Sequence, residues 1–286
     1  RERGAPGVDR ALVEIQPAGE GSPFFCVHPV GGDVLCYAAL SRELGADRPF
    51  LGLRAIPADV PAVTRLEDLA SRYLAEVRAA QPVGPYLLGG WSLGGLVAFE
   101  MARQLRRSGE EVGLVALIDP PAPAFGRRPL VREDGIALQF AQDLAALHGQ
   151  SLPALAEPLT ASGGGALLRQ LYDRLRASRL LPQEIGIEEL RWRFAVFERN
   201  FRAAERYAPG PCDAPLALIL AEGQSGAAER AAAWAPLAAA GLEVHRLAGD
   251  HYSLLAGRRV EPLAARLRAL LESADRLRAP ETSTTA

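Results

Sequence analysis

Short apolar runs of strand-like composition alternate along this chain with longer segments whose apolar residues recur at helical spacing. This alternation is typical of an α/β fold with a largely parallel sheet, because a crossover helix normally follows each parallel strand. We therefore expect strands with helices between them. The expected strands are residues 11–16, 23–28, 49–53, 85–90, 112–118, 215–221 and 242–247. The expected helices are residues 34–44, 66–80, 93–107, 227–240 and 259–276.

Residues 122–209 break the alternation, because they contain no convincing strand and only amphipathic helical patterns. We expect this segment to be an all-helical insertion over the sheet, with helices near 132–148, 164–180 and 187–207. Residues 1–10 and 276–286 have the composition of a linker and a flexible tail. These limits leave residues 11–275 as one folded domain.

The composition restricts what the chain can bind. Its 286 residues are 49% hydrophobic, enough for a sizeable core, and 32 basic against 34 acidic residues create no general attraction for nucleic acid or anionic lipid. The three cysteines, Cys26, Cys36 and Cys212, lack CxxC spacing, which argues against a disulfide framework or a thiolate metal site. No apolar run approaches the roughly 20 residues that span a bilayer, and no signal-peptide pattern begins the sequence. We expect a cytoplasmic protein with no metal, nucleic acid or membrane partner.

The sequence GWSLG, residues 90–94, matches the pattern G-x-S-x-G between an expected strand and an expected helix. Glycines in this pattern permit a tight, strained turn that lifts the serine oxygen out of the sheet. The helix N-terminus adds a partial positive field near that oxygen. We therefore predict that Ser92 is a nucleophile; the alternative is a glycine-rich turn that only joins a strand to a helix.

A serine hydroxyl is a poor nucleophile unless a base accepts its proton, and histidine is the usual base at neutral pH. Among the four histidines, His251 follows an expected strand and lies in the loop before the last helix. Loops at the carboxyl ends of strands are where α/β sheets gather their sites. His28 ends the second strand, His245 lies inside a strand and His148 falls in the helical insertion. We predict His251 as the base, with an exposed loop histidine as the alternative.

A carboxylate is needed to fix the histidine tautomer and to support its positive charge. Asp119 ends the strand that follows the serine's strand, and Glu222 ends a later strand in the same way, so the residues hardly separate these two candidates. Asp250 is a weaker candidate, because a neighbour in sequence rarely faces the ring of His251. Asp33 is also weaker, because it opens a helix and would cap it there.

Four short motifs accompany the helical insertion: HPVGG at 28–32, GWSLGG at 90–95, LIDP at 117–120 and GDHYSLL at 249–255. As a set they resemble the type I thioesterase domains that end polyketide synthases and nonribosomal peptide synthetases. The resemblance covers roughly residues 11–275. It implies the α/β-hydrolase fold, with a mostly parallel central sheet flanked by helices and an all-helical lid at about 122–209.

The resemblance also implies roles for individual residues. In that family the acid follows the strand after the nucleophile's strand, which favours Asp119 over Glu222. The backbone N–H groups of Val30 and Leu93 match the oxyanion-hole positions. No cofactor is expected to be bound covalently, because the substrate arrives on the phosphopantetheine arm of an upstream acyl or peptidyl carrier domain, and residues 1–10 would be the remaining linker. A homodimer is compatible with the resemblance.

The reaction that the resemblance implies is a two-step acyl transfer. Ser92 attacks the thioester, with His251 as base and Asp119 orienting it, and an acyl-serine forms. Water, or an internal hydroxyl or amine, then releases a linear acid or a macrocycle. The apolar side chains of the lid would line the product chamber or, more commonly for such residues, pack in a core. These are Phe140, Leu144, Leu168, Leu171, Trp192, Phe194 and Phe197.

Three other functions share parts of this pattern. A stand-alone editing (type II) thioesterase would have the same triad and fold, but such proteins usually carry GHS rather than GWS. A carboxylesterase or lipase would hydrolyse oxygen esters, commonly with an HGGG-type loop or a secretion signal, and neither appears. A non-catalytic α/β-hydrolase-like binding module would be expected to lose a triad member, whereas every candidate is present.

Overall fold

The structure is a computed structural model and describes residues 10–56, 63–123, 131–147, 159, 164–223 and 226–278. Three predictions made from the sequence fall on other residues. His148, residues 1–9 of the expected linker and residues 279–286 of the expected tail lie outside the described part of the chain.

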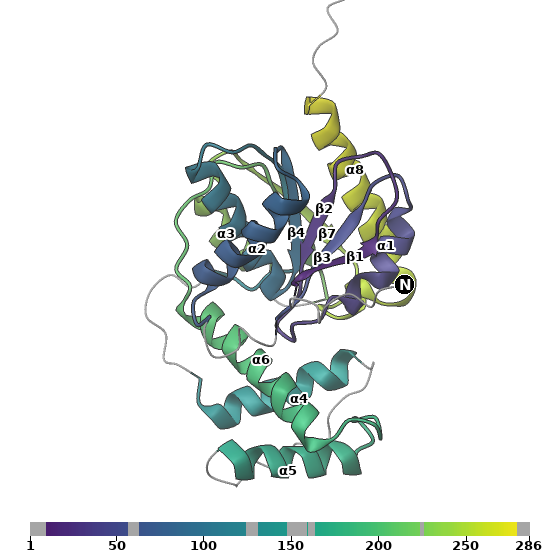
Figure 1. The fold of residues 1–286 in the computed structure, drawn as a ribbon, viewed down its shortest axis with the longest axis vertical. Helices are drawn as coiled ribbons and strands as arrows, with labels where there is room; N and C mark the ends of the chain where they lie inside the picture. Colours follow the sequence, from purple (N-terminus) through teal and green to yellow (C-terminus); the bar gives the residue numbers. More distant parts are fainter. Residues whose placement is uncertain are drawn as a thin grey trace, which may run out of the picture.

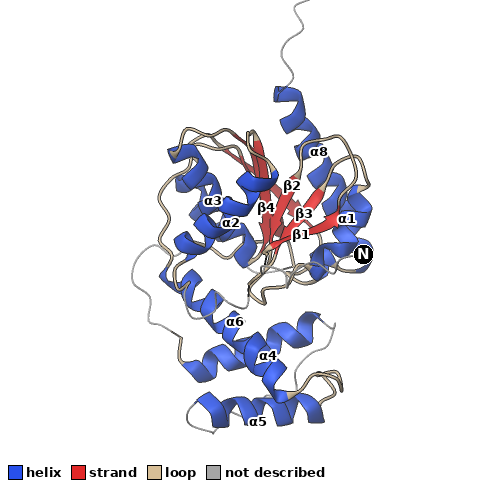
Figure 2. Ribbon diagram, viewed as in Figure 1, coloured by secondary structure: helices blue, strands red, loops and turns tan. Residues whose placement is uncertain are grey.

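Seven strands form one sheet in the order β1-β3-β2-β4-β5-β6-β7 (Figures 1 and 2). β1 is antiparallel to β3, and all the other neighbouring pairs are parallel. The strands are β1 (Leu12–Gln16), β2 (Phe24–Val27), β3 (Phe50–Leu53), β4 (Tyr86–Trp91), β5 (Val112–Ile118), β6 (Leu216–Ala221) and β7 (Leu242–Leu247). Each begins and ends within one residue of its predicted position.

Helices cover both faces of the sheet, as Figure 1 shows. On one face, α2 and α3 pack with the sheet in one apolar cluster that also includes Trp234 of α7. On the other face, α1 and α8 contribute to a second cluster. These helices are α1 (Ala38–Leu44), α2 (Leu66–Ala80), α3 (Leu93–Arg107), α7 (Ala227–Trp234) and α8 (Val260–Arg278). The strands between the two clusters are almost continuously buried, as expected for a sheet covered on both faces.

Three further helices lie together at one end of the sheet, at the bottom of Figures 1 and 2. They are α4 (Glu133–Leu147), α5 (Gly164–Ala177) and α6 (Ile187–Arg206), and we call them the lid. Five of the seven apolar residues predicted for this insertion are buried in its own cluster: Phe140, Leu168, Leu171, Phe194 and Phe197. Leu144 packs against that cluster, whereas Trp192 is 37% exposed. The lid therefore has a core of its own.

Several helix boundaries differ from the predictions. The helix expected at 34–44 begins with a 3₁₀ turn, Leu35–Tyr37, and the one expected at 227–240 changes to 3₁₀ at Ala235–Leu237. Pro236, which has no N–H to donate, lies in the second of these turns. Residues 276–278 were predicted to begin the tail, but they belong to α8. Their sequence, Arg-Leu-Arg, consists of good helix formers and continues the helix.

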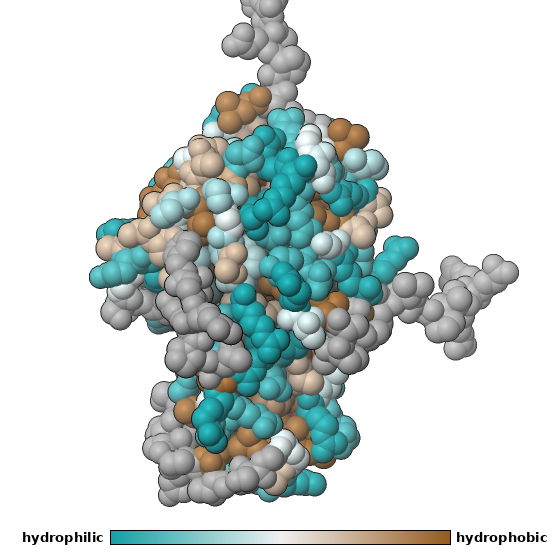
Figure 3. Space-filling model, turned by 90° about the vertical axis from the view of Figure 1, so that its left-hand side faces the viewer, coloured by the Kyte–Doolittle hydropathy of each residue, from teal (hydrophilic) through white to brown (hydrophobic). Residues whose placement is uncertain are grey.

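The surface and the cysteines complete the description. On the face drawn in Figure 3, hydrophilic side chains form a broad vertical band and apolar ones are scattered, several of them around the lid. Within the described ranges, no helix combines the length and the apolar character that crossing a membrane requires. The same residues contain no group of side chains suited to hold a metal ion. Cys26, Cys36 and Cys212 are free thiols.

Candidate active site

Ser92 lies between the end of β4 and the start of α3, at the predicted strand-to-helix turn. Its φ angle is 58°, in a region that residues other than glycine rarely adopt. The neighbouring glycines make this turn possible. A Cβ atom on Gly94 would lie 2.2 Å from the carbonyl oxygen of Val27, and one on Gly90 would lie 2.3 Å from the backbone of Gly94. The G-x-S-x-G pattern is therefore a packing requirement at this corner.

Asp119 and His251 lie together at the carboxyl ends of the strands. Asp119 follows β5, with a φ of 43°, and its Oδ2 lies 2.6 Å from Nδ1 of His251. The aspartate is 1% exposed. Since a carboxylate can only accept, Nδ1 carries the proton, and Nε2 is left free to accept one.

Two more donors fix the Asp119 carboxylate. The amide of Ala221 donates to Oδ1 at 2.9 Å, and the guanidinium of Arg230 donates to the same oxygen at 2.7 Å. Burial by itself raises the pKa of Asp119, but the hydrogen bonds from His251 and Ala221, together with the charge of Arg230, outweigh burial and lower that pKa. The aspartate therefore stays ionised at neutral pH and supports a positive charge on the imidazole. No motif of the sequence pointed to Arg230.

The alternative acids lie elsewhere. Glu222 is exposed, and its backbone N–H donates to Leu247. Asp250 accepts hydrogen bonds from the amides of its own loop, and Asp33 accepts one from Leu35. Of these carboxylates, only Asp119 is hydrogen-bonded to His251.

The other described histidines have different partners. His245 lies 2.9 Å from Glu243 on the outer strand β7. His28 is fully buried, with Nδ1 2.6 Å from the carbonyl of Pro29 and Nε2 2.7 Å from the hydroxyl of Tyr73. A carbonyl only accepts, so Nδ1 donates, and the neutral ring accepts from the tyrosine. His28 thus holds the start of the HPVGG loop instead of acting as a base.

We expect His28 to make the fold sensitive to acid. Burial, together with the charge of Arg199, lowers the pKa of His28 from 6.5 to about 4. The unfolded chain therefore takes up a proton at a higher pH than the folded chain, so acid favours unfolding. Stability from this residue is complete above pH 6.5, is lost as the pH falls toward 4, and decreases by about 2 kcal/mol between pH 7 and pH 5.

Urea unfolding at the two pH values measures this loss. The His28→Gln variant, whose side chain stays neutral, should lose less stability than the wild type by that amount. An equal loss in the two proteins would contradict the assignment.

The loop at residues 28–32 is held from the lid as well as from the sheet. The side-chain amide of Asn200, on α6 and 1% exposed, donates to the carbonyl of Val30 at 2.8 Å. Within the loop, Gly32 donates to Pro29 at 2.9 Å. Leu93 is the first residue of α3, where backbone N–H groups lack partners inside the helix. Val30 and Leu93 line the same cavity as Ser92.

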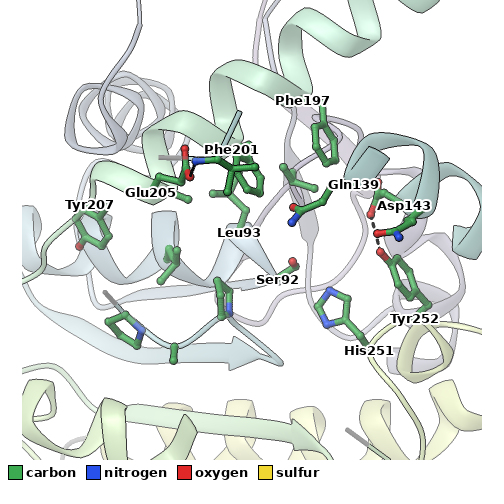
Figure 4. A pocket seen from close by; sticks show the side chains of 18 residues that line it. Ser92, Leu93, Gln139, Asp143, Phe197, Phe201, Glu205, Tyr207, His251 and Tyr252 are labelled. Atoms are coloured by element: carbon green, nitrogen blue, oxygen red, sulfur yellow. Dashed lines mark hydrogen bonds between the residues drawn. The ribbon is translucent and has the colours of Figure 1, made fainter. Parts of the chain in front are cut away.

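That cavity has a volume of about 510 Å³ and lies between the lid and the sheet edge that carries the site. Ser92 and His251 both line it, and Figure 4 shows the imidazole beside the serine. Its size is that of a small-molecule site. The apolar wall includes Leu93, Leu96, Phe197, Phe201 and Pro121, and polar side chains come from α4, α6 and Tyr252.

Trp91 contacts His251 and helps to hold it in position. The two rings lie 4.7 Å apart, and the indole N–H donates to the carbonyl of His251 at 3.1 Å. The backbone N–H of Trp91 donates in turn to Tyr37, whose hydroxyl donates to the carbonyl of Val27. The residue before Ser92 therefore connects the histidine loop to the central strands.

The sheet topology and the turn that carries Ser92 define an α/β-hydrolase. The sequence model of one family within that fold, described as "Thioesterase domain", matches residues 22–271. The chain therefore belongs to the thioesterase domain family.

Its relatives include very large proteins. The chain is 44% identical over 110 residues to a dimodular nonribosomal peptide synthase of Bacillus subtilis, an alignment that covers 38% of this chain and 5% of the relative. It is 27% identical over 282 residues to nonribosomal peptide synthetase atrA of Aspergillus terreus, covering 94% of this chain and 30% of the relative. A solved four-domain nonribosomal peptide synthetase matches with a TM-score of 0.82 and 30% identity, over 91% of this chain and 20% of that one. The chain thus spans less than a third of the length of each of these proteins.

Proposed function

We propose that this chain is the chain-terminating thioesterase domain of an assembly line of the nonribosomal peptide or polyketide type. It releases the finished acyl chain from the phosphopantetheine thioester of a carrier domain. The observation that carries the proposal is the hydrogen-bonded pair of His251 and Asp119 beside Ser92, at the base of a cavity covered by the lid. Similarity to nonribosomal peptide synthetases supports a peptide product over a polyketide.

The proposed reaction uses Ser92, His251 and Asp119 as the triad. Nε2 of His251 accepts the serine proton as Oγ attacks the thioester carbonyl, and Asp119 stabilises the imidazolium. The backbone N–H groups of Val30 and Leu93 stabilise the oxyanion. The C–S bond then breaks, and the pantetheine thiol leaves with the proton from His251. Water, or a hydroxyl or amine of the acyl chain, then attacks the carbonyl of the acyl-serine and gives its proton to His251. His251 passes a proton to Oγ of Ser92 as the ester bond breaks.

The domain limits are part of the proposal. Residues 11–275 form the thioesterase domain, with the lid inserted at about 122–209, and residues 1–10 are the remaining linker from a carrier domain. Because that carrier brings the substrate on its phosphopantetheine arm, the thioesterase itself needs no resident cofactor. The GWS sequence at residues 90–92 and the multidomain relatives support this reading over a stand-alone editing thioesterase.

Mass spectrometry of a stalled reaction tests the proposal. Mixed with a panel of acyl-pantetheine thioesters, the protein should gain the mass of the acyl group on the peptide that contains Ser92. The released products are scored as acid or ring. Oxygen esters of the same acyl chains are the control, since a lipase or carboxylesterase would turn these over instead. Turnover of thioesters with the acyl group on a residue other than Ser92 would overturn the proposed mechanism.

A further inference from the structure

Asp143 is a carboxylate that the proposed reaction does not use. It lies on α4 of the lid and lines the cavity, and its Oδ1 accepts a hydrogen bond from the hydroxyl of Tyr252 at 3.1 Å. Tyr252 follows His251 in the sequence, and Figure 4 shows the Asp143–Tyr252 pair next to the imidazole. An acidic group of the lid therefore lies directly beside the reacting centre.

Asp143 differs from the second carboxylate of the cavity wall. Glu205 accepts a hydrogen bond from the amide of Val131 at 2.8 Å and one from the guanidinium of Arg202 at 3.1 Å. The sequence has no lysine, and no arginine of the described segments lies within ion-pair distance of Asp143. Burial raises the pKa of Asp143 to about 6, against the opposing effects of Tyr252 and His251. Even a partly buried carboxylate is unfavourable when no cation is near it, and a bound cation would offset this.

The position of Asp143 restricts where such a cation would lie. A Cβ atom built on Gly31 would be 3.7 Å from Oδ2 of Asp143, so the carboxylate borders the loop that contains Val30. Its other oxygen faces Tyr252, in the loop of His251. A thioester carbonyl attacked by Ser92 would lie between these two loops. The group nearest Asp143 would then be a substituent on the first carbons of the acyl chain.

We propose that Asp143, together with Tyr252, forms a subsite for a protonated amine on the acyl chain, one or two carbons from the reacting carbonyl. The preferred substrates are then aminoacyl or peptidyl thioesters with a free amine at that position. The assignment rests on the proposed function, because it takes the carbonyl position from the attack by Ser92. An ammonium group fits better than a neutral donor, since it supplies a positive charge as well as the hydrogen bond.

Binding to a protein that cannot react tests this subsite. We would measure the affinity of the Ser92→Ala variant, by calorimetry, for stable pantetheine amides of an amino acid and of its des-amino isostere. We expect the amine to bind about tenfold more tightly, as for a charge-assisted hydrogen bond. Adding Asp143→Asn should bring the two affinities within about twofold. Asp134→Asn is the matched control, because Asp134 lies on the same helix with its side chain 49% exposed, and it should leave the preference unchanged.

Each other outcome overturns the subsite. The preference for the amine could persist in the Asp143→Asn variant. Alternatively, Asp143→Asn could weaken the binding of both amides equally, which is expected if the contact between Asp143 and Tyr252 is purely structural. A hydroxyl analogue that binds as tightly as the amine would assign a neutral donor instead. Absence of measurable binding of the amine at millimolar concentration would also reject it. A lost acyl adduct on Ser92 would reject the proposed function but leave a preference measured here intact, so the two failures can be told apart.

Discussion

Replacing Ser92 with alanine is expected to lower kcat for release from an acyl-pantetheine thioester by about 10⁵-fold. The substitution removes the oxygen that would form the acyl intermediate, while the pair of His251 and Asp119 and the cavity are retained. Substrate binding should therefore change little, so KM should stay within a few-fold. Thiol release measures the rate, and the intact mass of the protein measures the acyl adduct, which should disappear.

The fold should tolerate this change. At a φ of 58° alanine has about the same backbone strain as serine, since both carry a Cβ atom, and alanine adds no atom. Ser108→Ala is the matched control. Ser108 follows the other end of α3, where its hydroxyl donates to the carbonyl of Gln104. The Ser108→Ala variant should retain the wild-type rate. A Ser92→Ala protein that keeps more than about 1% of the wild-type rate would show that another group is the nucleophile.

The sequence predicted the sheet and the strand-to-helix turn at Ser92, because both depend on neighbours along the chain. The inner strands are short apolar runs, and the turn at Ser92 needs small residues at fixed positions, Gly90 and Gly94. The residues alone do not separate the two candidate acids, because Asp119 and Glu222 both directly follow a strand. What separates them is lateral order in the sheet: β5 lies next to β4, whereas β6 lies one strand further away.

The contacts that complete the site could not be predicted in the same way. Arg230 reaches Asp119 across 111 residues of sequence, and Asn200 reaches Val30 across 170. Asn200 did carry a signal, since the buried residues three or four positions away on the same helix, Val196, Phe197 and Ala203, are all apolar. Arg230 and Asp143 had none, because charged residues on amphipathic helices normally face solvent. Their roles depend on how separate helices pack over the strand ends.

The substitution Asp119→Asn is expected to lower kcat by about 10⁴-fold, through the tautomer of His251. Ala221 and Arg230 both donate to Oδ1 of Asp119. An asparagine must keep its carbonyl oxygen on these donors, which turns its NH₂ group toward Nδ1 of His251. Nδ1 must then accept, the ring proton moves to Nε2, and that nitrogen can no longer take the proton of Ser92.

Glu222→Gln is the matched control, because it makes the same change of acid to amide at the end of the next strand, on an exposed side chain. We expect it to stay within about twofold of the wild-type kcat. Circular dichroism of both variants should match the wild type, since asparagine has nearly the volume of aspartate. If Glu222→Gln lost more rate than Asp119→Asn, the acid would belong to β6, and the 2.6 Å contact between Asp119 and His251 would be structural. If both lost little, His251 would not depend on a carboxylate for its orientation, and the chemistry would rest on Ser92 and His251 alone.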